Sequence, residues 1–181
     1  LTDDLASFLM LADQRKVQII VKEMMSKDVV QAVRDGRANL GVIWDNTETS
    51  GLQHVDYYND QIAAVVSRSH PLCDLPELVL ADALKFEMVT MRHSRHTEAM
   101  LKRTGLTGDL RMMSRLEVST WEAGLRCAGH GLGMFLCSAR LARIYAETWG
   151  LQVMPLADAW NKQVNKIIYP TGLNNPLAMQ L

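Results

Sequence analysis

Apolar side chains recur along the chain with two different spacings, and each spacing predicts one kind of element. Between residues 5 and 12, and again between 26 and 36, they recur every three or four positions, which is typical of a helix with one buried face. Ser26 is placed to cap the second helix, and Gly36 is placed to end it. Short runs rich in β-branched or aromatic residues predict strands instead. These runs are 17–21, 38–44, 61–67, 86–91, 110–118, 132–137, 151–156 and 164–170.

The same alternation of strand and helix occurs twice, once before and once after the stretch 68–80, which contains two prolines. Three further helices are predicted from a serine at the start and a glycine near the end, and in one of them Ser119 and Glu122 have the spacing of a capping box. These helices are 94–105, 119–129 and 138–150. The order favours a mostly parallel sheet covered by helices. The repetition predicts two lobes with a cleft between them.

Polar residues follow three of the predicted strands at points where a helix begins. In open α/β sheets, ligands bind beyond the carboxyl ends of the strands, where free N–H groups at a helix start attract anions. A serine at such a point has an alternative role as a simple helix cap, which contributes about 1 kcal/mol. The candidate binding residues at these points are Met25, Ser26, Met91, Arg92, His93, Ser94, Val118, Ser119 and Thr120.

Arg92 would contribute most if the ligand is a carboxylate. A hydrogen bond to a charged group contributes about 1.5–3 kcal/mol, against about 0.3–1 kcal/mol for a helix dipole. The alternative is that Arg92 is a solvated loop arginine. Trp44, Asp45 and Asn46 lie where the strand 38–44 ends, and they combine an aromatic wall with polar groups, which is typical of small-molecule sites. Alternatively, Trp44 packs in the core and the two polar residues form a turn.

Combinations of residues that would support catalysis or metal binding are weak. His93 and His96 have one-face spacing on a helix, but no third ligand lies nearby in the sequence. The glycines of 129–133 join a helix to a strand, whereas a dinucleotide-binding loop joins a strand to a helix. Asp45 and Glu48 have no identifiable acid or base partner. The sequence therefore predicts a binding domain rather than an enzyme, with no cofactor and no metal.

Composition narrows the class of protein further. The chain has 181 residues, is 48% hydrophobic and 22% charged, and has a net charge of -1. Clustered Lys and Arg are missing, which argues against a nucleic-acid surface on this stretch. Three cysteines without a CxxC pair indicate reduced thiols in the cytosol. No membrane-spanning run or signal peptide is evident, and a start at Leu1 with an end one turn after Pro176 suggests a fragment of a longer protein.

Three segments, read together, resemble one family. They are "RDGRANLGV" (34–42), "LQHVDYYNDQIAAVVSRSHPL" (52–72) and "GLRCAGHGLGMFLCS" (124–138). In order and at this spacing they resemble the effector-binding domain of LysR-type transcriptional regulators, and the resemblance covers nearly the whole chain. The resemblance implies an α/β fold of the type 2 periplasmic-binding-protein kind, with two Rossmann-like lobes joined by two crossover strands. Lobe I would comprise 1–66 and 164–181, and lobe II would comprise 67–163.

The resemblance also implies a function. Family members bind a small effector, often a carboxylate or an aromatic acid, in the cleft between the lobes, on loops that match the candidate residues above. The domains pair into dimers, and the full-length proteins form tetramers. DNA would be contacted only through an N-terminal domain. This chain lacks that domain and also lacks the family's first strand. We therefore expect a cytoplasmic ligand-sensing domain that forms a homodimer or homotetramer. A transporter's solute-binding protein, or an enzyme on the same scaffold, is the alternative.

Overall fold

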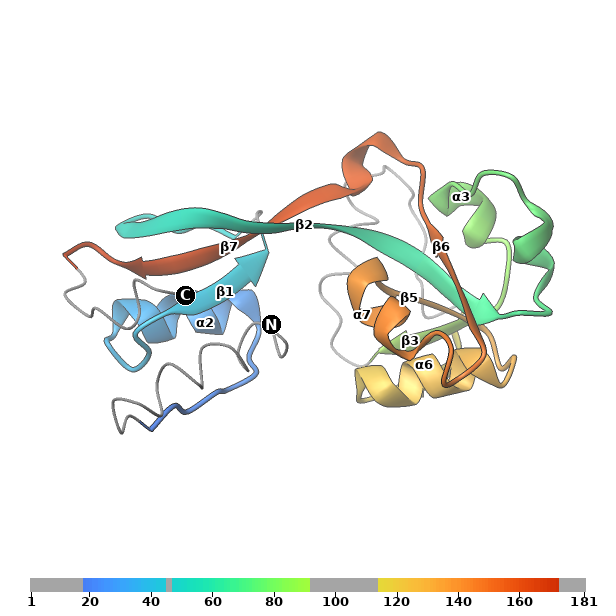
Figure 1. Cartoon of the computed structure of the whole chain (residues 1–181), viewed down its shortest axis with the longest axis horizontal. Coiled ribbons are helices and arrows are strands. Elements are labelled where there is room, and N and C mark those ends of the chain that lie inside the picture. The colour runs from blue at the N-terminus through green and yellow to red at the C-terminus, as the bar shows by residue number, and fades with distance from the viewer. Residues whose placement is uncertain (1–17, 45–46, 92–113, 173–181) are drawn as a thin grey trace. The chain divides into compact units, whose positions relative to one another are not determined.

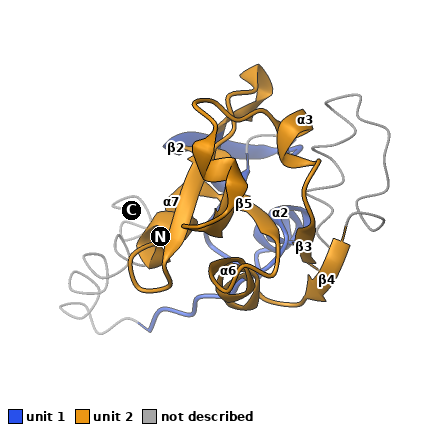
Figure 2. Cartoon of the chain, turned by 90° about the vertical axis from the view of Figure 1, so that its right-hand side faces the viewer, with its two compact units in different colours: residues 1–58, 164–181 blue, residues 59–163 orange. Residues whose placement is uncertain are grey.

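A computed structural model of the chain describes residues 18–44, 47–91 and 114–172. The chain divides into two compact units (Figures 1 and 2), Leu1–Tyr58 with Val164–Leu181, and Asn59–Gln163. Two strands, β2 (Leu52–Ser67) and β7 (Lys162–Pro170), carry the chain from one unit to the other. The lobe boundary expected at 66 lies further along β2 than this division, and it stays a prediction.

Among its described residues, the first unit has one helix against a small sheet. Helix α2 (Ser26–Arg34) packs on β1 (Gly41–Trp44), which pairs antiparallel with β7 from Gly41 opposite Ile168 to Trp44 opposite Asn165. The predicted apolar stripe of the helix is buried in one cluster, which contains Val29, Val30, Val33, Ile43 and Ile168. Gly41 is needed for this approach, because a Cβ there would overlap the side chain of Val29. The 26–36 helix was therefore predicted correctly.

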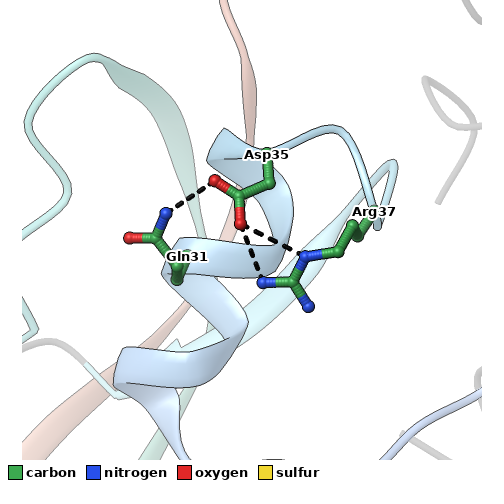
Figure 3. A network of polar contacts seen from close by, with 3 residues as sticks. All are labelled: Gln31, Asp35 and Arg37. Carbon is green, nitrogen blue, oxygen red and sulfur yellow. Dashed lines mark hydrogen bonds and ion pairs between the residues drawn. The ribbon is translucent and has the colours of Figure 1, made fainter.

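The end of α2 also follows the prediction. The helix ends at Arg34, and Gly36 adopts a φ of 69°, a left-handed conformation that favours glycine. An exposed network next to this turn holds the cap residue Asp35 (Figure 3). Gln31 Nε2 donates to Asp35 Oδ1 at 2.6 Å, and Arg37 Nη2 donates to Asp35 Oδ2 at 2.9 Å. The hydrogen bonds from Arg37 and Gln31 lower the pKa of Asp35.

The predicted strand 17–21 is wrong for the part that the structure describes. Residues 18–21 have no regular secondary structure, and Ile20 and Val21 are 72% and 60% exposed. β-Branched residues favour a strand only where a neighbouring strand supplies the ladder. Within the described ranges, β1 pairs with β7 and no strand pairs with 18–21.

The second unit contains a five-stranded mixed sheet in the order β6-β2-β5-β3-β4. Helix α6 packs against it, and Phe135, Leu125 and Val89 lie in the core between them. Gly124 allows the Phe135 ring to approach α6, because a Cβ there would lie 2.5 Å from the ring. The remaining elements are η1 (Pro71–Asp74), α3 (Leu80–Ala83), β3 (Met88–Met91), β4 (Ser114–Val118), α6 (Trp121–Gly129), β5 (Met134–Ser138), α7 (Ala139–Tyr145), β6 (Leu151–Pro155) and η2 (Ala159–Asn161).

The pairing corrects the expectation of a mostly parallel sheet. β3 runs parallel to β4 and β5, but β2 runs antiparallel to β5 and β6, and β1 runs antiparallel to β7. The difference arises because β2 and β7, the strands that join the units, run against the strands beside them. The predicted helices at 5–12 and 94–105 and the strand start at 110–113 lie outside the described residues.

Candidate functional site

The first unit brings the start of α2 to the end of β1. The N-cap of α2 is Met25, with an extended backbone and no side-chain cap bond. Ser26 is the first helical residue, and its Oγ accepts a hydrogen bond from the backbone N–H of Trp44 at 3.4 Å. The prediction that Ser26 caps the helix is therefore wrong. Its hydroxyl instead joins two segments 18 positions apart, because the cap position was taken by Met25.

Trp44 lies at the edge of the core rather than inside it. Its strand neighbour Ile43 is buried against α2, whereas Trp44 points to the other face and is half-buried. Met25, the N-cap of α2, is exposed. Asp45 and Asn46, which were predicted to line the same site, lie outside the described residues.

The second unit brings together two strand ends and a helix start. Met91 at the end of β3 lies directly beside Val118 at the end of β4, in parallel register. Both side chains are half-buried and pack against the core cluster together with Trp121. Ser119 and Thr120 follow Val118 directly and are exposed. Arg92, His93 and Ser94, predicted for the loop after Met91, lie outside the described residues.

Thr120, not Ser119, is the N-cap of α6. Thr120 Oγ1 accepts from Ala123 N at 3.2 Å, while Glu122 accepts a hydrogen bond from Arg126 Nε at 3.0 Å. The predicted Ser119–Glu122 capping box is therefore wrong. The backbone of Thr120 is extended, as a cap requires, and the cap is one residue later than expected. The similar prediction for Ser138 is confirmed, since Ser138 Oγ accepts from Leu141 N at 3.0 Å.

The glycine-rich turn after α6 has a structural role. The helix includes Gly129, His130 is its C-cap, and Gly131 has the left-handed φ of 72°. The predicted end of the helix at Gly129 is confirmed, because Gly129 is the last helical residue. Gly133 lies against the backbone of Met88, where a Cβ would be 3.2 Å from the carbonyl carbon. In the part of the chain that the structure describes, no group of three or more His, Cys, Asp or Glu residues could hold a metal ion.

Sequence reasoning missed the buried polar residues in the middle of β2 and around the start of β7. Asp60 accepts from Ser138 Oγ at 2.5 Å and from Gln61 N at 2.8 Å. Asn161, Gln163 and Asn165 are also buried. A signal was present, because Asn161, Gln163 and Asn165 recur at every second position of "NKQVNK" (161–166), although only Asn165 falls within the strand predicted at 164–170. Asp60 and burial together raise the pKa of the neighbouring Cys137 thiol to about 12, with burial the larger cause.

Two α/β units linked by two crossover strands define a ligand-binding domain of the periplasmic-binding-protein-like class. The family model described as LysR substrate binding domain matches residues 9–181. The chain therefore belongs to this family, the effector-binding domain of LysR-type transcriptional regulators. No curated protein matches the chain by sequence. No helix among the described residues is long and apolar enough to cross a membrane.

Solved structures share the fold at low identity. The full-length BenM E226K mutant superimposes with a TM-score of 0.78 at 19% identity, over 97% of this chain and 59% of the mutant. The BenM effector-binding domain with its effector benzoate gives a TM-score of 0.74 at 19% identity, over 96% and 80%. The effector-binding domain of QuiR in complex with shikimate gives 0.72 at 9% identity, over 97% and 83%. The chain thus spans about 59% of the full-length regulator that it matches.

Proposed function

We propose that this domain senses a small organic acid on behalf of a DNA-binding regulator. The effector contacts would come from Met25, Ser26 and Trp44 in the first unit, and from Met91, Val118, Ser119 and Thr120 in the second. Asp45, Asn46, Arg92, His93 and Ser94 remain predicted contacts next to them in the chain. The predicted location is the cleft between the two lobes.

One observation carries the proposal. In each unit separately, the candidate residues meet at the carboxyl end of a strand beside the start of a helix, as in the Ser26–Trp44 hydrogen bond and the Met91–Val118 register. Exposed N–H groups and the positive dipole end at such a start favour an anion by about 0.3–1 kcal/mol. A hydroxyl accepts and donates at once, so Ser26 can accept from Trp44 and donate to a carboxylate.

The ligands of the similar structures support an acidic effector. Benzoate and shikimate, the molecules bound by BenM and QuiR, are both small carboxylates. In the complete regulator, binding would change the affinity for DNA through a coupling free energy of about 1–3 kcal/mol. That protein would be a cytoplasmic homodimer or homotetramer that contacts DNA through another domain. No chemical bond in the effector would be made or broken.

Thermal unfolding and titration calorimetry with benzoate, shikimate and other small carboxylic acids test the proposal. An acid present at a hundred times its dissociation constant stabilises the domain by about 2.7 kcal/mol. Ser26→Ala should weaken binding about tenfold, the loss expected for one hydrogen bond to a charged group. Ser50→Ala is the matched control, because Ser50 is an exposed serine of the same unit whose hydroxyl bonds Glu48.

Two results would contradict the proposal. One is that no acid stabilises the wild-type domain. The other is that proton NMR of the mixture shows the acid being converted, which would indicate an enzyme rather than a sensor.

A further inference from the structure

Strand β7 carries two buried amide side chains with unpaired polar atoms. Gln163 is 6% exposed and Asn165 is 2% exposed. Gln163 Oε1 and Asn165 Nδ2 have no hydrogen-bond partner within the described part of the chain. Buried polar atoms are almost always paired, and leaving one unpaired costs free energy. These two atoms therefore need partners that the described chain does not supply.

The neighbouring Asn161 shows that this part of the fold can pair a buried amide completely. Asn161 Oδ1 accepts from Ile62 N at 2.7 Å, and Asn161 Nδ2 donates to the carbonyl oxygens of Ile62 and Leu156 at 2.9 and 2.7 Å. Asn165 comes only four positions later and is buried as deeply. Its unpaired Nδ2 is thus a local feature of β7 rather than a general property of the region.

Asn165 lies at the proposed effector contacts of the first unit. β7 and β1 are neighbouring strands (Figure 1). Asn165 is directly opposite Trp44 in their antiparallel ladder, so the two side chains emerge on the same face of the sheet. The backbone N–H of Trp44 is in turn bonded to Ser26. Residue 165 was not among the candidates from the sequence, yet the ladder places it beside one of them.

The two unpaired atoms have opposite hydrogen-bonding character. Asn165 Nδ2 is a donor, which an oxygen of the ligand would accept from, and Gln163 Oε1 is an acceptor, which needs a donor. Their positions alternate along the strand, so both side chains emerge on one face about 7 Å apart at the backbone. A hydroxylated acid offers both groups, whereas an acid without a hydroxyl offers only acceptors.

We propose that Asn165 and Gln163 are further effector contacts, and that the effector is an acid that also carries a hydroxyl group. This inference rests on the proposed function. Asn165 Nδ2 donates to an oxygen of the effector, and Gln163 Oε1 accepts the proton of its hydroxyl. Without the effector, these two buried atoms have no hydrogen-bond partner among the described residues.

The test uses Asn165→Leu and Gln163→Leu, with shikimate as the hydroxylated probe and benzoate as the acid without a hydroxyl. We expect the wild type to bind shikimate more tightly than benzoate. Asn165→Leu should weaken shikimate binding at least about tenfold while the ligand-free domain unfolds at the same or a higher temperature. Gln163→Leu should weaken shikimate binding and leave benzoate binding unchanged. Gln152→Leu, at an exposed amide on β6, is the control that should change neither.

The outcomes separate this inference from the proposed function. If the wild type responds to acids but both leucine variants bind shikimate as well as it does, the contacts are wrong and the sensor function stands. If the wild type prefers benzoate, the hydroxylated class is wrong. If the wild type binds neither probe, ligand-free unfolding decides. A lower unfolding temperature for Asn165→Leu, and for the milder Asn165→Ser, means that the amide is already paired and overturns the proposal.

Discussion

Asn161, the last residue of η2, and Asn165, near the start of β7, are two buried asparagines whose surroundings differ. The Asn161 side chain forms three hydrogen bonds, to the backbone of Ile62 and Leu156, whereas Asn165 Nδ2 has no partner among the residues that the structure describes. Asn161 connects the turn before β7 to β2 by hydrogen bonds within the second unit. Asn165 lies opposite Trp44 in the first unit. Equal burial therefore accompanies two roles, one that holds the fold and one that is available to a ligand.

Removing the paired amide of Asn161 should have the largest effect on stability. Asn161→Leu preserves the approximate volume but leaves the N–H of Ile62 and the carbonyl of Leu156 without this partner in a dry site. We expect a loss of about 3 kcal/mol in the free energy of unfolding, since each unsatisfied buried group costs about 1–3 kcal/mol. Urea denaturation measures it. An equal loss in Asn165→Leu would remove the distinction between the two residues.

A second anchor on β2 should give a smaller effect. Ser138 donates to Asp60 and caps α7 through Leu141 N, so its hydroxyl joins the crossover strand to a helix start. Ser138→Ala should cost about 1–2 kcal/mol, the usual range for a lost cap. The exposed Ser69→Ala is the control. Unchanged stability in Ser138→Ala would mean that the buried Asp60 carboxylate contributes nothing through this contact.

Much of the fold could be predicted from local pattern. The corrections concern strand pairing, which depends on tertiary structure, and helix caps, which depend on the backbone angles of single residues. The apolar stripe of α2, the left-handed Gly36 and the Ser138 cap depend on residues a few positions apart. The strand expected at 17–21 required a neighbouring strand, which the sequence of that segment does not specify. The caps of α2 and α6 were each assigned one position too late or too early, to Ser26 and Ser119, because a cap depends on the backbone angles of single residues.

The candidate site, too, could be predicted only in part. Its strand ends and helix starts were predictable, and the structure brings Ser26 to Trp44 and Met91 to Val118. Asn165 was not predictable as a neighbour of Trp44, since that depends on the register of two strands over a hundred residues apart in the chain. Pairing of buried side chains is decided by tertiary structure.

The smallest expected effect concerns a polar group whose pairing depends on protonation. His70 Nδ1 accepts from Leu72 N at 3.2 Å, which requires that nitrogen to be unprotonated, and burial lowers the pKa of His70 below its usual 6.5. Because the pKa is lower in the folded state, this contribution is complete above about pH 6.5 and is lost as the pH falls through the folded-state pKa. His70→Gln should flatten that part of the pH profile of the unfolding temperature, whereas His54→Gln, at an exposed histidine, should not.

The central claim is that a small acid binds where the strand ends meet the helix starts, at β1 with α2 and at β3 and β4 with α6. The chain has four tryptophans, whose signals report on binding separately. Trp44 ends β1 and Trp121 begins α6, so both lie at these places, while Trp149 stacks on Tyr145 and Trp160 lies in η2. The measurement is an NMR titration of the indole N–H signals, assigned with single Trp→Phe variants. We expect that an acid which stabilises the domain shifts the indole signals of Trp44 and Trp121 and leaves those of Trp149 and Trp160 in place. Shifts confined to Trp149 or Trp160 would contradict it.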